Sequence, residues 1–269
     1  FRYDMGFGTL ISSSSYEDRR VDVKADRVIA FGGLLEFFSG EPAGSTVSAP
    51  FVDATINKKY VQELRLQSSE SDKYEWVVGG IYSKETGGTQ QSLTALPSGY
   101  VLLDVFLSTL LKELAAFGDF KYYINEKFDV SIGARLSKVT ATLETIEDGA
   151  GVIVRPEEEV EESATTDTYS FTARYRPNDD MSIYARVASG YRPTSPATPI
   201  GDLPGIVETD TLWSYEVGVK GQALDSKLSY DLVAWYLNWQ NLQGVVFAGA
   251  ASSIPNVDTD VPAKGVDGS

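Results

Sequence analysis

The sequence predicts an all-β fold: an antiparallel up-and-down transmembrane β-barrel segment of about ten to eleven strands. Segments that alternate apolar and polar residues are separated by connections that are short and then long, without exception. This pattern is typical of outer-membrane barrels, whose turns are short on the periplasmic side and long outside. A transmembrane helix is not predicted, because the sequence has no run of about 18 to 20 apolar residues.

The clearest strand pair lies between Asp167 and Pro193, on either side of a turn at 177–180. One face of this pair is apolar and carries Tyr169, Phe171, Ala173, Tyr175, Met181, Ile183, Ala185 and Val187. The opposite face carries Arg174, Arg176 and Arg186. A soluble sheet is compatible with this pair alone. In a membrane barrel the turn would face the periplasm, the arginines the lumen, and the end at Tyr191 and Arg192 the outside.

The same alternation predicts further strand pairs around short turns. The expected strands cover residues 1–5 and 9–16, 58–69 and 74–84, 113–124 and 128–145, and 211–221 and 227–246. A last alternating segment begins near Asp267. These strands exceed the usual five to six residues of globular sheets and suit a tilted bilayer crossing.

Five long connections join these pairs, at residues 17–57, 85–112, 146–166, 193–210 and 247–263. Within the first, Phe31 to Phe38 is compatible with a short helix or a packed patch in a loop, and we favour the packed patch. Residues 100–114 have apolar residues at mixed spacing, which is compatible with a helix inside the second connection. In the third, the acidic run Glu157 to Glu162 favours a solvated loop over a Ca²⁺ site, because calcium ligands usually come at spaced positions.

The composition excludes several kinds of chemistry. The 269 residues include no Cys and no His, so disulfides, His-containing catalytic triads and His-ligated metals are excluded. We expect no enzymatic activity and no cofactor. The formal net charge of −15 argues against nucleic acid as a partner, because Lys and Arg drive binding to phosphate backbones.

Charged and aromatic side chains have expected places in such a barrel. Glu63 and Arg65 share a face, as do Glu216 and Lys220, and we expect them in ion-pair ladders of a wet lumen. Aromatic residues near strand ends fit interfacial girdles as well as ordinary strand propensity: Tyr74, Trp76, Tyr122, Tyr123, Tyr169, Trp213, Trp235 and Trp239.

Several segments resemble, in order along the chain, the barrels of TonB-dependent outer-membrane receptors of the siderophore-receptor type. They are 61–68 (VQELRLQS) with 76–82 (WVVGGIY), 117–119 (FGD) with 129–136 (DVSIGARL), 184–193 (YARVASGYRP), 215–220 (YEVGVK) and 264–267 (KGVD). No single segment is specific, but the ordered set is. Asp267 stands where the family usually has Glu.

The resemblance implies a 22-stranded barrel in the outer membrane of a Gram-negative bacterium. It also implies active uptake of a scarce ligand, most often a ferric siderophore, with outer-membrane lipid around the barrel and energy from the TonB complex. We expect residues 1–269 to be a partial barrel domain without the plug that contacts TonB and without the terminal strands. Siderophores, cobalamin, haem and oligosaccharides all use this scaffold, so the sequence does not identify the ligand.

The candidate ligand-binding residues are Tyr191, Arg192, Trp239 and Gln243. All four are expected near the outer ends of strands that run from the periplasmic side to the outside. Tyr and Arg suit bulky, often anionic ferric complexes through stacking and charge-assisted hydrogen bonds. An interfacial aromatic with a lumen ion pair explains Tyr191 and Arg192 as well.

Other functions remain open at this point. A passive porin would have similar strands and loops. An outer-membrane enzyme would need carboxylate catalysis, because the chain has no His. A soluble β-rich carbohydrate-binding domain would use the aromatic residues as platforms.

Overall fold

The fold is one large antiparallel sheet, seen in a computed structural model that describes all residues except 148–157, 197–205, 226, 245, 249–250, 254–255 and 258. The elements are β1 (Arg2–Asp4), β2 (Gly8–Asp26), α1 (Val28–Ser39), β3 (Pro50–Ser68), β4 (Tyr74–Thr94), β5 (Val101–Asn125), β6 (Phe128–Glu147), β7 (Glu158–Asn178), β8 (Met181–Arg192), β9 (Ser195–Pro196), β10 (Ile206–Val207), β11 (Asp210–Ala223), β12 (Leu228–Gln240), β13 (Val246–Ala248), β14 (Ala251–Ser253) and β15 (Val261–Gly268). Among the described residues, no helix is long and apolar enough to cross a bilayer.

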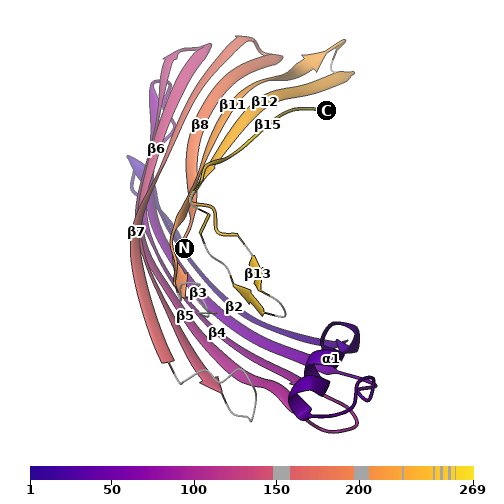
Figure 1. The fold of residues 1–269 in the computed structure, drawn as a ribbon. Helices are drawn as coiled ribbons and strands as arrows, with labels where there is room; N and C mark the ends of the chain where they lie inside the picture. Colours follow the sequence, from indigo (N-terminus) through magenta and orange to yellow (C-terminus); the bar gives the residue numbers. More distant parts are fainter. Residues whose placement is uncertain are drawn as a thin grey trace.

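Eleven strands form the main sheet, in the order β1-β2-β3-β4-β5-β6-β7-β8-β11-β12-β15. Every neighbouring pair is antiparallel, and β1 and β15 are the two edges. The sheet curves into an open half-shell, with the β13–β14 hairpin on its concave side (Figure 1). The predicted all-β, up-and-down architecture and the strand number are therefore confirmed.

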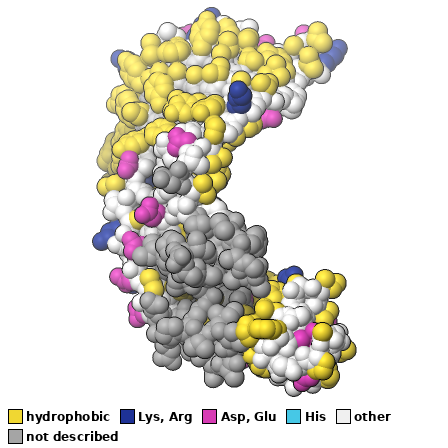
Figure 2. Space-filling view, in the orientation of Figure 1, with side chains coloured by type: hydrophobic (Ala, Val, Ile, Leu, Met, Phe, Trp, Pro, Cys, Tyr) yellow, Lys and Arg dark blue, Asp and Glu magenta, His cyan; other side chains and the backbone are white. Residues whose placement is uncertain are grey.

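The two faces of the sheet differ as the alternation predicts. Leu114, Ile132 and Val217 lie on one face and are 64%, 61% and 60% exposed. We call this the apolar face, and the face that carries the charged ladders the polar face. Figure 2 shows hydrophobic side chains gathered in a continuous area over the part of the sheet that Figure 1 labels β8, β11 and β12. In the Asp167 to Pro193 strand pair, Tyr169, Phe171 and Tyr175 lie on the apolar face as expected.

The strands are longer than expected, and this corrects three predictions. Residues 85–112 are not an irregular span, because β4 continues to Thr94 and β5 begins at Val101. Residues 100–114 are strand rather than helix. The β4–β5 connection is therefore only residues 95–100, so the strict alternation of short and long connections is wrong there. Ladder hydrogen bonds decide the conformation here, and they form without alternation: the outer part of β4 is mostly polar on both faces, and the outer part of β5 has apolar residues on both.

The first and third connections are also shorter than expected. β2 continues to Asp26 and β3 begins at Pro50, so only 27–49 remain between them. Between β6 and β7 lie residues 148–157, which include Glu157 and are outside the described residues. The rest of the acidic run begins β7 rather than filling a loop. No cluster of acidic side chains suited to a metal is found in the described part of the chain.

Phe31 to Phe38 form a helix, not the packed loop patch that we favoured. Helix α1 buries Leu35 completely, against Ala49, Leu93, Ala95 and Leu102 from the neighbouring loop and strand ends. The carboxylate of Asp26 accepts the N–H of Val28 at 2.9 Å and the N–H of Ala49 at 3.0 Å. Helix α1, the core around Leu35 and the Asp26 contacts together form the α1 cap. It lies at the end of the sheet opposite the short turns (Figure 1).

Glu36 ties the rest of the connection to the α1 cap. Its carboxylate accepts the backbone N–H of Thr46 at 2.8 Å and of Gly44 at 2.9 Å. These hydrogen bonds, that from Thr46 first, hold the pKa of Glu36 below its ordinary value of 4.5. Gly40 ends the helix with φ of 73°, a left-handed conformation that glycine adopts without strain.

Candidate ligand-binding site

The polar face carries a series of ion pairs, within strand β3 and between neighbouring strands. Arg65 contacts Glu63 at 3.0 Å, which confirms that the two share the face. Asp129 accepts from Arg174 at 3.0 Å and from Arg176 at 2.9 Å. Further pairs join Lys59 to Glu85, Arg135 to Glu113 and Arg186 to Glu216. The predicted ladders are therefore present, although Lys220 lies over the ring of Tyr184 rather than against Glu216.

The end of β8 at Arg192, far from the short turns, separates from its neighbour β7. β8 pairs with β7 only as far as Ala188, whereas it pairs with β11 as far as Arg192. The chain then continues through β9, which lies against β6 and β7. β7 itself continues along β6. The end of β8 thus lies over the polar face, beside the candidate site.

Arg192 and Asp210 are the centre of this site. They lie directly opposite each other on β8 and β11. The Asp210 carboxylate is 1% exposed and accepts from Arg192 Nε at 2.8 Å, from Arg192 Nη2, and from the backbone N–H of Arg192 at 3.1 Å. The Arg192 side chain keeps 44% of its surface exposed. A buried carboxylate that accepts several hydrogen bonds from one arginine fixes the guanidinium plane.

Trp239 and Gln243 complete the cluster from β12 and the chain that follows it. The guanidinium of Arg192 lies 4.8 Å from the centre of the Trp239 ring. Arg192 Nη2 donates to the carbonyl of Gln243 at 2.9 Å, and the N–H of Gln243 donates to Asp210 at 3.1 Å. We call Arg192, Asp210, Trp239 and Gln243 the mouth cluster. Three of the four residues predicted from the sequence are brought together in it.

Tyr191 is not part of the mouth cluster. Its hydroxyl donates to Glu113 Oε1 at 3.3 Å, so it joins the ion pair of Glu113 and Arg135 on the polar face. Because Tyr191 directly precedes Arg192 in the strand, the sequence predicted that the two residues share one site. The separation of β8 from β7 turns its side chain toward β5 instead.

The sequence did not predict the contacts that fix the loops around the cluster, nor the part that Asn256 plays in them. The Gln243 side-chain amide donates to the carbonyls of Pro193 at 3.1 Å and Glu208 at 2.9 Å. Asn256 accepts the N–H of Glu208 at 2.7 Å and donates to the carbonyl of Asn241 at 2.9 Å. Asp210 was missed as well. Its only signal is its place at the start of a strand, where antiparallel pairing would set it opposite Arg192.

The mouth cluster offers a ligand one partly free cation. Trp239 Nε1 is buried and has no hydrogen-bond partner among the described residues. The exposed guanidinium of Arg192 lies over the same indole. Together they suit an anionic group with oxygen acceptors and a flat apolar part.

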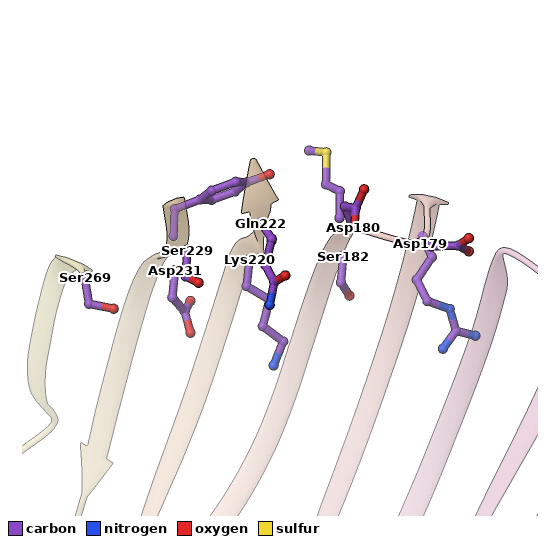
Figure 3. A pocket seen from close by; sticks show the side chains of 12 residues that line it. Asp179, Asp180, Ser182, Lys220, Gln222, Ser229, Asp231 and Ser269 are labelled. Atoms are coloured by element: carbon purple, nitrogen blue, oxygen red, sulfur yellow. The ribbon is translucent and has the colours of Figure 1, made fainter. Parts of the chain in front are cut away.

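A hollow lies at the short-turn end of the sheet. It has a volume of about 490 Å³ and is lined by residues of β8, β11 and β12, including Ser182, Lys220 and Asp231. Figure 3 shows these three side chains at one level below the turns, beside Ser269. Its position at the opposite end of the strands separates it from the mouth cluster.

The architecture and the whole length of the chain match one family. The model of the TonB dependent receptor-like β-barrel family matches residues 1–269. This chain belongs to the TonB-dependent receptor family. Barrels of this family are outer-membrane proteins of Gram-negative bacteria.

Individual relatives of this TonB-dependent receptor chain are distant. The pesticin receptor of Yersinia pestis is 24% identical over 187 residues, which cover 68% of this chain and 27% of that protein. The ferric yersiniabactin uptake receptor FyuA from Yersinia pestis has a similar structure, with a TM-score of 0.77 at 17% identity over 98% of this chain and 37% of that one. The copper transporter OprC gives a TM-score of 0.73 at 12% identity over 97% of this chain and 41% of that one. The chain thus spans about a quarter of the length of the curated relatives it matches.

Proposed function

We propose that this chain is part of the barrel wall of an outer-membrane receptor that takes up a ferric siderophore with energy supplied through TonB. The observation that carries the proposal is the mouth cluster, which presents Arg192 and the Trp239 indole on the polar face of a TonB-dependent receptor barrel. The ferric yersiniabactin receptor has a similar fold. Family membership argues against the passive porin, the outer-membrane enzyme and the soluble carbohydrate-binding domain.

Two parts of the proposal concern the whole protein. Coupling to TonB requires a plug inside the barrel, and we propose that residues 1–269 are a partial barrel domain of a protein that has one. The ion pairs of the polar face would then line the wall around this plug. The ligand is proposed as a ferric siderophore because its iron-binding oxygens and bulk suit a cation beside an aromatic ring.

Uptake of radioactive iron tests the proposed function. Cells with and without the gene would be given ferric yersiniabactin, ferric citrate or a ferric catecholate. We expect deletion to abolish uptake of one of these, and a protonophore to stop that uptake in cells with the gene. Uptake that persists without a proton gradient would indicate a passive pore, and unchanged uptake of all three would contradict the proposed ligand class.

Variants of the mouth cluster test the site separately. Arg192→Ala alone leaves the buried Asp210 without its cation, so its effect mixes binding with stability. The double variant Arg192→Gln with Asp210→Asn removes both charges and keeps hydrogen-bonding groups. In the full-length receptor we expect it to weaken binding of the transported complex about tenfold, the loss of one charge-assisted contact. Arg186→Ala, on the same face of β8 but paired with Glu216, is the control. Unchanged affinity in the double variant would remove Arg192 from the ligand site.

A further inference from the structure

Four exposed lysines lie at one level on the apolar face of neighbouring strands: Lys58 in β3, Lys84 in β4, Lys112 in β5 and Lys138 in β6. Lys84 is directly opposite Lys112 in the β4–β5 ladder. Lys58 and Lys138 are diagonal neighbours of this pair, opposite Thr86 and Leu114. We call these residues the lysine row. It ends at β7, which carries Thr165 opposite Lys138.

The lysine row marks the end of the apolar belt, which is the band of apolar and aromatic side chains on the apolar face between the lysine row and the short turns. Between each lysine and the short-turn end, the same face is mostly apolar or aromatic: Tyr60, Leu64 and Leu66 in β3, Val78 and Tyr82 in β4, Leu114, Ala116 and Phe120 in β5, and Ile132, Ala134 and Leu136 in β6. Tyr74 and Lys84 are ten residues apart along β4. Ten residues of strand span about 33 Å, or about 25 Å along the bilayer normal at a tilt near 40°, which is the height of a barrel's apolar band.

Three of the four residues in the lysine row also lack the counter-charges that lysines on the polar face have. Lys59 pairs with Glu85 at 2.9 Å, and Lys121 with Glu75 at 3.8 Å. In the lysine row, Lys58 pairs with Asp18 at 3.9 Å, whereas Lys84, Lys112 and Lys138 form no ion pair with any described residue. Like charges directly opposite in a ladder destabilise a sheet, so Lys84 and Lys112 are best accommodated by an external anion between them.

We propose that the lysine row binds the phosphate groups of the phosphorylated glycolipid in the outer leaflet of the membrane. Lysine stems lie along the apolar surface while the ammonium groups reach the headgroup level, where the lipid phosphates are. Anionic lipid compensates the repulsion within the row, and the acyl chains cover the apolar belt below it. The inference rests on the proposed outer-membrane location, because only there does the apolar face meet this lipid.

Lipid titration of the full-length receptor tests this inference. The purified receptor in detergent would be titrated with bis-phosphorylated lipid A, and with the same lipid after removal of its phosphates, and bound lipid counted by native mass spectrometry. Each lysine near an anionic surface changes affinity by about fivefold, so K84Q/K112Q/K138Q is expected to bind lipid A about 100-fold more weakly. K84R/K112R/K138R keeps the charge and is expected to bind like the wild type.

The matched control is K73Q/K127Q/K227Q, which removes three lysines from the short turns at the other end of the strands. It is expected to bind lipid A as the wild type does. Equal binding by K84Q/K112Q/K138Q, or equal binding of the phosphate-free lipid, would overturn the inference. So would displacement of lipid A by inorganic phosphate at millimolar concentration, because the row would then bind the free ion. The proposed function fails independently, if the wild-type receptor does not fractionate with the outer membrane or does not take up iron.

Discussion

The sheet has a long half, β2 to β7, and a short half, β8, β11 and β12. The two halves differ in strand length and in the contacts that fix their connections at the end opposite the short turns. Strands β2 to β7 have 19 to 25 residues, whereas β8, β11 and β12 have 12 to 14. At about 3.3 Å per residue, the long strands span about 63 to 83 Å and the short ones about 40 to 46 Å. Only the long half extends well beyond the apolar belt.

The long half closes over an apolar core and the short half over a buried carboxylate. In the long half, the α1 cap buries Leu35 against strand ends that project beyond the belt. In the short half, the strands end near the belt, so the connections turn inward and are fixed by hydrogen bonds to Asp210. Among the described connections, the one between the long strands β2 and β3 has its own apolar core, and those between the short strands are held by hydrogen bonds. We infer that the long half is a fixed rim and the short half the ligand-contacting side.

Leu35→Ala is expected to have the largest effect on this contrast. Removing a fully buried leucine side chain costs about 3 to 4 kcal/mol, and here the loss falls on the α1 cap. Hydrogen exchange of residues 27–49 should accelerate, while the mouth cluster stays protected. Ile29→Ala, on the fully exposed face of the same helix, is the control and should change nothing. Equal acceleration in both halves would show that they are one cooperative unit.

Removing one partner of the Arg192–Asp210 pair is expected to have a smaller and asymmetric effect. Arg192→Ala leaves a buried carboxylate without its cation and should cost about 3 kcal/mol. Asp210→Ala leaves a half-exposed guanidinium that water can solvate and two unpaired backbone N–H groups, at about 1 to 2 kcal/mol. Hydrogen exchange of the amides at Arg192 and Gln243 measures both. Equal costs would contradict a site centred on the buried carboxylate.

The smallest expected effect is a pH dependence confined to the α1 cap. A carboxyl whose pKa is lower in the folded state stabilises that state above its unfolded pKa, and this contribution is lost as the pH falls through the folded value. Protection of the Gly44 and Thr46 amides should therefore decline below about pH 4.5. Glu36→Gln should lower protection at neutral pH and remove the decline. Glu41→Gln, exposed in the same connection, should keep it.

Sequence reasoning predicted the part of the fold that alternation controls. Within the belt, each strand has one exposed apolar face, so apolar positions recur every second residue, and the strand pairs and their short turns were found there. Beyond the belt the two faces no longer differ, because outer β4 is mostly polar on both and outer β5 has apolar residues on both, and the signal disappears. The outer parts of β4 and β5 were therefore mistaken for an irregular span, and α1, whose apolar face packs only on strand ends, was mistaken for a loop patch.

The candidate site was predicted only where its residues lie on or next to strands that alternate. Arg192, Trp239 and Gln243 were placed by counting outward along strands that alternate. Asp210 and Asn256 act through chain connections whose course the sequence does not encode locally. Tyr191 was misplaced relative to Arg192 because neighbours in sequence share an environment only while the strand stays flat, and β8 leaves β7 after Ala188.

Spin labels along β4 in the full-length receptor would test the central claim, that the apolar face is a lipid-facing belt ending at the lysine row. The 269 residues contain no cysteine, so single cysteines at Val78, Tyr82, Thr86 and Gln90 can be labelled in this part of the protein. We predict high oxygen accessibility at Val78 and Tyr82, high accessibility to a water-soluble relaxant at Thr86 and Gln90, and the change between them at Lys84. Lipid exposure that continues to Gln90, or equal accessibility at Leu64 and Arg65 on the two faces of β3, would contradict the account.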